Sequence, residues 1–421
     1  MFVMGRVRSV SYSAPRRERP GDVSQSEVVS RGARRFVGAS VLFLIAAQGA
    51  ALAGAGRRTV VSLTLLGFVF HMLFGKAYSL VPSYFVRELA FPRAPALQLP
   101  FSLVGAVGVG LAPLPGVPAV VGAVGGVAWV VGVAVFLATV LWTLRGNLLG
   151  GETGTSEANV HRGRVDRVAN AAVPVALSYF AVGSYEVAAL ETGLPRLLGG
   201  ALAADTHLLA AGTAALMVLA VGLRLLPRFL VATPPWPLVV VVLPAGAVGP
   251  ALLAGAFLGG PLFLAGAVLE AVAVLGFAAT YGVLYWRTDR DRVGFTGVLA
   301  GAVCGVLGIG LGLQFAVAGL DPALAVAHFR LNLVGFLGLT IVGVAYQFYP
   351  PAVGTFPGAG DRAALASIWL VFGGLLVEVA GIAGGRPTVA SLGQAVGLAG
   401  AILYAYIVLG LFRQRYGWLA R

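Results

Sequence analysis

Three of the four histidines in this chain of 421 residues lie within or at the start of long apolar segments. These are His71, His207 and His328, whereas His161 lies in a polar segment. A polar side chain inside a membrane is costly, so such residues are candidates for function. A neutral imidazole nitrogen ligates iron and copper well. The three histidines are therefore candidates for a functional role, and metal ligation is one chemistry open to them.

Arg330 follows His328 by two residues and is a second kind of candidate. Its guanidinium is always protonated, so it cannot ligate a metal but can bind a carboxylate in a fork of hydrogen bonds. Two interpretations are open. Arg330 binds an anionic group of a ligand, such as a haem propionate, or it extends along the helix to the membrane surface.

A repeated pattern places these residues relative to one another. Gly-Phe-x6-Gly-x-Ala-Tyr-x3-Pro runs from Gly67 to Pro82 and again from Gly335 to Pro350. A weaker third copy keeps only the spacing of fifteen positions, between Gly212 and Pro227. The sequence therefore predicts an internal repeat whose unit is a membrane segment.

The histidines occupy different positions in the repeats. His207 and His328 lie five and seven residues before their repeat glycines, whereas His71 lies four residues after its own. With a rise of 1.5 Å per residue, His71 and His328 would differ in depth by about 16 Å if the repeats superpose. We therefore expect His207 and His328 to form the better pair for one haem or one outward-facing metal. The alternative is that each histidine packs at the outer interface or in the helix core.

Composition indicates an all-α integral membrane protein. Hydrophobic residues make up 58% of the chain, charged residues only 11%, and the mean hydropathy is +0.91. These values exclude a water-soluble domain. Apolar runs of about 20 residues span a bilayer as helices, because lipid offers no partner for free backbone groups. We expect about twelve transmembrane helices, at residues 36–55, 59–82, 98–114, 117–143, 170–190, 206–227, 235–257, 260–286, 295–318, 328–350, 365–384 and 388–412.

The remaining segments predict a simple domain organisation. Residues 1–35 are polar and rich in arginine, so we expect a disordered basic cytoplasmic extension. Residues 36–412 form a single polytopic transmembrane domain, and 413–421 form a short cytoplasmic tail. Segment 145–169 is the longest polar loop between the spans.

The distribution of arginine predicts the orientation. With twelve spans and the N-terminus inside, only Arg57, Arg58, Arg196 and Arg386 fall in outside loops. The positive-inside rule then predicts a multi-pass protein of the plasma membrane with both termini cytoplasmic. The net charge of +13 is explained by this bias, so the expected partner is the lipid bilayer and no nucleic acid is required.

Two passages resemble subunit I of the haem-copper oxidases and the related haem- and copper-containing nitric-oxide-response membrane proteins. The run from Ala327 through Leu331, followed by Gly343 and then Tyr349-Pro350, is similar to helix ten of that family. Val81-Pro82, leading to Ala90-Phe91-Pro92-Arg93, is similar to the end of helix two. The resemblance implies a pseudo-threefold arrangement of four-helix arcs, bound haem, and other membrane or redox subunits as partners.

The chain departs from that family at the copper site. The family's copper needs a histidine from helix six and an adjacent pair from helix seven, but residues 235–257 contain no histidine. Arg330 also stands where the second histidine of the helix-ten run would be. We therefore expect no binuclear haem-copper centre and no reduction of oxygen.

Two functional interpretations follow, and the sequence does not decide whether the chain is an enzyme. The first is a divergent haem-binding member of the oxidase subunit I superfamily, with an electron-transfer or nitric-oxide-related role. The second is a cofactor-free transporter, sensor or assembly partner, favoured by the missing ligands and by acidic residues such as Glu270 and Glu378 inside the spans.

Overall fold

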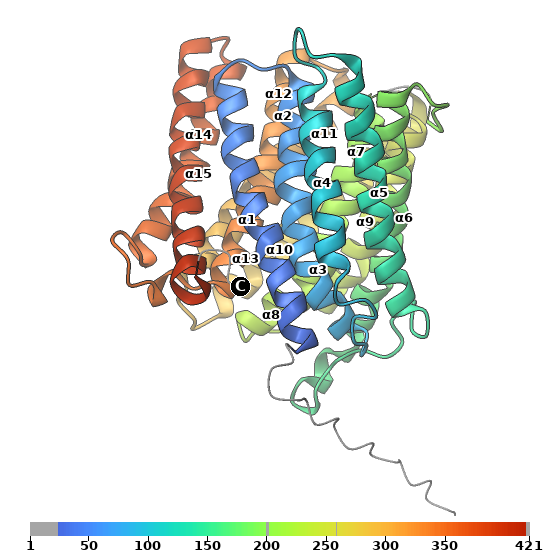
Figure 1. Cartoon of the computed structure of the whole chain (residues 1–421), viewed down its shortest axis with the longest axis vertical. Coiled ribbons are helices and arrows are strands. Elements are labelled where there is room, and N and C mark those ends of the chain that lie inside the picture. Colours follow the sequence, from blue (N-terminus) through green and yellow to red (C-terminus); the bar gives the residue numbers. More distant parts are fainter. Residues whose placement is uncertain (1–23, 199–201, 258, 418–421) are drawn as a thin grey trace, which may run out of the picture.

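The computed structural model describes residues 24–198, 202–257 and 259–417 (Figure 1). Within these ranges the chain is helical and contains no β-strand. Twelve helices in the described ranges are long and apolar enough to cross a membrane. The predicted all-α, multi-pass architecture is therefore confirmed.

Three of the spans consist of several helical pieces, and the others are single helices or begin with a short turn. The second span contains α2 (Arg57–Ser62), η1 (Leu63–Val69) and α3 (Phe70–Tyr84); the sixth contains α7 (Leu202–His207), η3 (Leu208–Ala215) and α8 (Leu216–Phe229); the tenth contains α12 (Pro322–Arg330), η4 (Leu331–Leu339) and α13 (Thr340–Phe348). The remaining elements are α1 (Gln25–Leu52), α4 (Ala94–Leu111), α5 (Ala119–Leu144), η2 (Glu157–Arg162), α6 (Gly163–Thr192), α9 (Trp236–Gly255), α10 (Gly260–Arg287), α11 (Val293–Ala318), η5 (Pro351–Val353), α14 (Asp361–Ala383) and α15 (Pro387–Tyr416).

The first helix begins earlier than expected. Residues 1–35 were predicted to be disordered, but α1 starts at Gln25. The Ser24 side chain accepts a hydrogen bond from the Glu27 backbone N–H, and Glu27 pairs with Arg31 one turn later. This N-cap and ion pair stabilise a helical turn that hydropathy alone does not reveal. Residues 1–23 of the expected extension lie outside the described residues.

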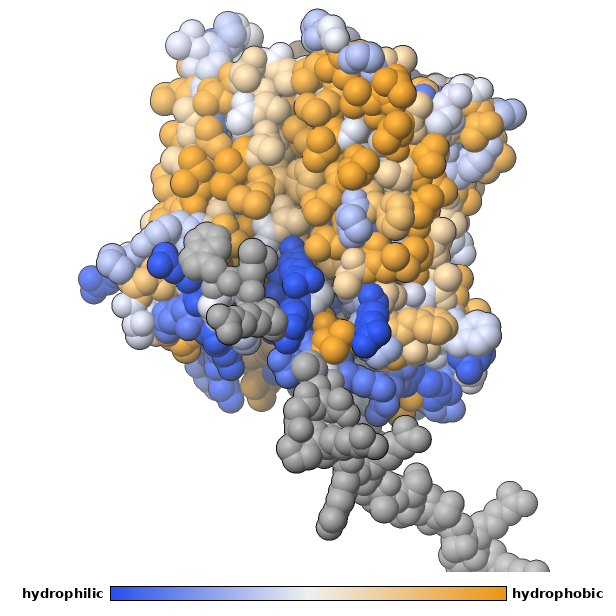
Figure 2. Space-filling view, in the orientation of Figure 1, coloured by the Kyte–Doolittle hydropathy of each residue, from blue (hydrophilic) through white to orange (hydrophobic). Residues whose placement is uncertain are grey.

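Both described ends of the chain lie at the same end of the bundle, which we call the terminal end (Figure 1). The guanidinium of Arg34 near the start of α1 lies 3.9 Å from the centre of the Tyr416 ring at the end of α15. Figure 2 shows strongly hydrophilic residues gathered at this end, below a broad hydrophobic surface. An apolar band with a charged rim is the surface expected of a membrane-spanning bundle.

The second, sixth and tenth spans form the centre of the bundle. In these three, 72–83% of the most apolar window is buried, against 39–50% in the other candidate spans. Each contains a π-helical segment, and the three segments η1, η3 and η4 contact one another. The π-helix is rare and is often found at functional sites. The repeated part of the sequence therefore builds the interior.

The repeat glycines allow the central helices to approach their neighbours closely. A Cβ atom at these positions would lie 2.4–2.7 Å from a side chain of the preceding span. That side chain belongs to Phe43 for Gly67, to Tyr179 for Gly212 and to Cys304 for Gly335. Each repeat glycine therefore makes the same type of contact, with the span that precedes its own.

The repeat tyrosines bind the following span instead. The Tyr78 hydroxyl donates a hydrogen bond of 2.7 Å to Oε1 of Gln98 in α4. The Tyr346 hydroxyl is 2.7 Å from the Ser367 hydroxyl in α14. Much of the Gly-Phe-x6-Gly-x-Ala-Tyr pattern is thus explained by packing and hydrogen bonding inside each repeat unit.

Candidate cofactor site

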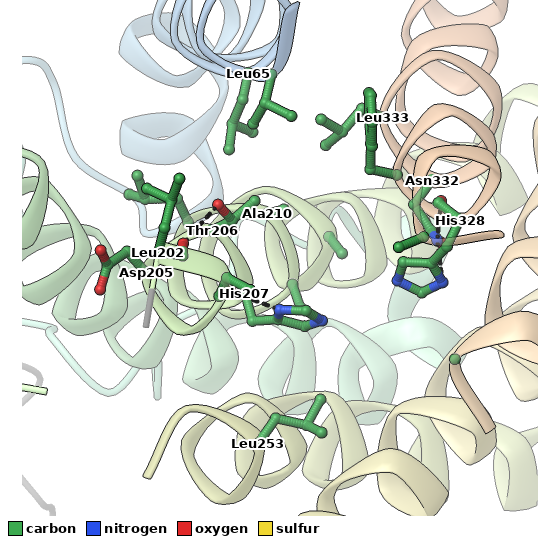
Figure 3. Close-up of a pocket in the computed structure, with 18 of the residues that line it drawn as sticks. Leu65, Leu202, Asp205, Thr206, His207, Ala210, Leu253, His328, Asn332 and Leu333 are labelled. Atoms are coloured by element: carbon green, nitrogen blue, oxygen red, sulfur yellow. Dashed lines mark hydrogen bonds between the residues drawn. The ribbon is translucent and has the colours of Figure 1, made fainter. Parts of the chain in front are cut away.

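A cavity of about 430 Å³ lies between the central spans, toward the end of the bundle opposite the terminal end. All three π-helical segments contribute to its wall, for example through Leu65, Ala210 and Leu333 (Figure 3). Most of its lining side chains are apolar. All three repeat units therefore contribute to the cavity.

Two histidines lie on this wall. His207 is the last residue of α7, and His328 lies near the end of α12. Their ring centroids are 6.3 Å apart and the ring planes differ by 23°. Figure 3 shows the two imidazoles side by side among the residues that line the cavity. The structure therefore brings together the two histidines that the repeat spacing placed at a similar depth.

Backbone carbonyl groups define the tautomer of both rings. Nδ1 of His207 is 2.7 Å from the Ala203 carbonyl oxygen, and Nδ1 of His328 is 2.8 Å from that of Gly308. A carbonyl oxygen only accepts hydrogen bonds, so each Nδ1 carries the proton. Each Nε2 then has a free lone pair, and in Figure 3 this nitrogen lies on the side of its ring that faces the other histidine.

Asn332 supports the position of His328 from one turn further along the helix. Its side-chain amide donates a hydrogen bond of 2.8 Å to the His328 carbonyl oxygen and lies 3.4 Å from the His328 Nδ1. Hydrogen bonds from neighbouring groups commonly orient histidines that bind metals. The sequence analysis did not select Asn332, although its spacing of four residues from His328 places both on one helix face.

Cationic side chains lie at the rim of the cavity where the second span begins. Arg58 forms an ion pair with Glu191. Arg57 is exposed, lines the cavity and forms no ion pair with any described residue. From the sequence, both arginines were predicted only to mark the orientation of the chain. Their adjacency at the start of a span was the available signal for a cationic rim.

Glu270 lies on the same wall but deeper, within α10. Only 6% of its surface is exposed, and its Oε1 has no hydrogen-bond partner among the described residues. The carboxyl packs against Gly249 of α9, where a Cβ atom would lie 2.8 Å from Oε1. The cavity therefore contains a buried carboxyl group without a described partner.

His71 lies outside this cavity. It is fully buried, its Nδ1 is 2.9 Å from the Leu66 carbonyl oxygen, and its Nε2 is 3.2 Å from the Ser102 hydroxyl. The ring also packs between Phe36 and Phe43. Both ring nitrogens are thus engaged inside an aromatic core, so the structure does not group His71 with the other two histidines.

Arg330 also lies outside the cavity wall. Its guanidinium is 1% exposed, donates to both carboxylate oxygens of Glu378 at 2.8–3.1 Å, and donates to Gln48 at 2.7 Å. The interpretation that Arg330 extends to the membrane surface is wrong, because a carboxylate inside the bundle neutralises it. Arg330 is not among the residues that line the cavity, whereas Arg57 and Arg58 are.

In the described part of the chain, no group of three or more His, Cys, Asp or Glu side chains is arranged to hold a metal ion. The cavity instead offers two imidazole nitrogens, which is the number that haem iron takes in its axial positions. No protein-family model matches the chain, and no curated protein is significantly similar to it. The geometry of this cavity is therefore the main basis for a functional proposal.

Proposed function

We propose that this chain is a haem-binding membrane protein related to subunit I of the haem-copper oxidases, with an electron-transfer role. The observation that carries the proposal is the pair His207 and His328, whose rings lie 6.3 Å apart on the wall of one cavity while their Nδ1 atoms are engaged by backbone carbonyl groups. Their Nε2 atoms are acceptors, and a metal ion or a hydrogen-bond donor can be bound by two such acceptor nitrogens at once.

The separation of the rings fits one metal ion. Bond lengths of about 2 Å from the ion to each Nε2, with each ring centroid about 1 Å further away, give centroids about 6 Å apart. The observed separation is 6.3 Å. In this arrangement the Nδ1 hydrogen bonds to Ala203 and Gly308 would hold each ring in its ligating orientation.

The remainder of the cavity supports haem over a bare ion. Its volume of about 430 Å³ lies within the range of roughly 300–1,000 Å³ that is typical of cofactor sites. Its lining is mainly apolar, as a porphyrin ring requires, and Arg57, which forms no ion pair with a described residue, would bind a carboxylate of the macrocycle.

The architecture supports the relationship to the oxidase subunit. In each four-span unit, the repeat glycine lies in the second span and contacts the first span. The second, sixth and tenth spans meet at the centre. We propose that the three units form pseudo-threefold four-helix arcs around this interior. Under the positive-inside rule the terminal end is cytoplasmic, the membrane is the plasma membrane and the cavity faces outward.

Electron transfer is favoured over gas chemistry. If His207 and His328 both held the iron of a haem, nitric oxide and oxygen would have no free ligation site. When bound, the haem would supply a one-electron redox centre. We therefore propose that the chain passes electrons to or from another redox subunit and does not reduce oxygen at a haem-copper centre.

A cofactor-free transporter, sensor or assembly partner is the second candidate. The observation that favours it is Glu270, because an unpaired carboxyl inside a membrane is typical of pathways for protons and ions. The two candidates differ in whether the purified protein contains haem.

A visible spectrum separates these two candidates. We expect protein purified after expression with added haem precursor to show a Soret band, at about one haem per chain. We expect His328→Ala to weaken or shift the band and His161→Ala to leave it unchanged, because His161 lies in the segment between α5 and α6. Protein without a Soret band would support the cofactor-free candidate.

A further inference from the structure

We propose that Glu270 is the proton-binding group of the cavity and takes up one proton when the site between His207 and His328 gains one electron. This inference rests on the proposed function. In the balanced step, a bound haem would accept one electron from a one-electron donor, and the Glu270 carboxylate would become a carboxylic acid with a proton from water outside the membrane. The net charge within the cavity is then unchanged.

Glu270 differs from the other acidic residues of the cavity. Glu191 is paired with Arg58 and Asp205 is paired with Arg196, so the charge of both carboxylates is compensated. Glu270 has no ion pair among the described residues. An unpaired charge in an apolar interior is costly. The protonation of Glu270 therefore depends on the other charges that enter the cavity.

The helix places Glu270 where water can reach it through the cavity. Phe263, Ala267, Glu270 and Val274 recur at intervals of three or four residues and all line the cavity, so they form one face of α10. Glu270 is ten residues from the start of α10, which is about 15 Å along the helix axis. The carboxyl thus lies near the middle of the span, on the wall of a cavity that reaches the surface at Arg57.

The helices packed against α10 supply little competing charge. The sequence of α9 contains no titratable side chain, and that of α11 contains only Cys304. The third neighbour, α8, contains Arg224 and Arg228, and both pair with Asp166 near the terminal end. None of these groups forms a described contact with Glu270.

Besides Glu270, the charged and titratable groups that line the cavity are Arg57, Arg58, Glu191, Asp205, His207 and His328. Tyr179 on the neighbouring α6 donates its hydroxyl hydrogen bond to the Ala247 carbonyl oxygen at 2.6 Å. Both histidines are engaged as ligands in the proposed function. Glu270 is therefore the group that is free to exchange a proton when the charge of the site changes.

The test is a redox titration of the haem-loaded protein at several pH values. We expect the midpoint potential of the wild type to fall with rising pH by up to about 59 mV per pH unit, which corresponds to one proton per electron. We expect Glu270→Gln to bind haem normally and to lose this slope. Glu157→Gln is the matched control, because this exposed residue lies at the terminal end, and it should keep the wild-type slope.

Infrared difference spectra provide a readout that does not depend on the potential. We expect the reduced-minus-oxidised spectrum of the wild type to contain a positive carboxylic acid C=O band that shifts in D2O and is missing in Glu270→Gln. The inference would be overturned if the midpoint potential of the wild type did not depend on pH. It would also be overturned if Glu270→Gln kept the slope and the C=O band. Neither result would contradict haem binding. Absence of haem would instead contradict the proposed function.

The haem-free protein keeps the inference testable if Glu270→Gln folds poorly. Glu270→Asp retains the carboxyl group, so we expect it to retain the slope and a displaced C=O band. In haem-free wild type we expect an acid C=O band at neutral pH that addition of haem diminishes. A carboxyl group ionised both with and without haem would contradict the proposal.

Discussion

At the scale of single residues, the most strongly constrained polar contact is the ion pair between Arg330 and Glu378. Both residues are 1% exposed, and Gln48 and Gln394 add hydrogen bonds to the guanidinium and the carboxylate respectively. Removal of one partner from a buried pair leaves an uncompensated charge, whereas replacement of both by apolar groups often costs little. We therefore expect the single and double substitutions of this pair to differ in their effect on the free energy of unfolding.

Arg330→Ala should destabilise the folded protein by about 3–5 kcal/mol, because Glu378 is left unpaired in the interior. Thermal unfolding in detergent measures this effect. The double variant Arg330→Met with Glu378→Leu should recover most of the loss, and the exposed Arg386→Ala should behave as the wild type. A single variant as stable as the wild type would show that Glu378 is compensated by other groups.

The sequence predicted the pairing of His207 and His328 through their positions relative to the repeat glycines. It did not predict the state of their rings, because the Gly308 carbonyl that binds His328 belongs to another span. Nor did it predict the partner of Arg330, since Glu378 is 48 residues away along the chain. Contacts between helices distant in sequence leave no signal in a single sequence.

At the scale of the elements, the repeat glycines determine how closely the central helices approach their neighbours. At Gly335, a Cβ atom would lie 2.4 Å from the Cβ of Cys304 and 2.8 Å from its Sγ. Because both atoms are close to the backbone of α11, they cannot move aside without shifting the helix. A methyl group at this position therefore strains the contact between α11 and η4.

Gly335→Ala should lower stability by about 1–3 kcal/mol, the usual cost of overpacking. Gly373→Ala in α14 is the matched control. A Cβ there meets nothing within 4 Å, and alanine favours helix over glycine, so this variant should be neutral or stabilising. Equal melting temperatures for the two variants would contradict the packing role of the repeat.

Hydropathy predicted most spans of the bundle to within a few residues, because the length of each apolar run is set by the membrane. It did not predict the three π-helical segments, which depend on how the central helices pack around the cavity. It also placed the start of the first helix eleven residues too late, since the turn from Gln25 is stabilised by a cap and an ion pair and not by apolar residues.

At the scale of the whole molecule, the proposed orientation would put the cavity on the outer side of the membrane. Arg57 and Arg58 line the rim, and the terminal end carries most of the described arginines. This orientation follows from the charge bias and predicts which residues an impermeant reagent can reach.

In a Cys304→Ala background, Arg386→Cys should react with an impermeant maleimide added to intact cells, whereas Arg290→Cys should react only after the cells are opened. Arg386 lies between α14 and α15 at the end opposite the termini, and Arg290 lies between α10 and α11 at the terminal end. The reverse pattern would invert the topology and direct the cavity toward the cytoplasm.

The central claim is that His207 and His328 bind the same iron from opposite sides. Binding of carbon monoxide to the reduced, haem-loaded protein tests this claim most directly, because the ligand needs an open axial position. We predict that the wild type and His71→Ala give no carbon monoxide spectrum, whereas His207→Ala and His328→Ala each give one. Wild-type protein that binds carbon monoxide readily, or a spectrum that only His71→Ala alters, would contradict the account.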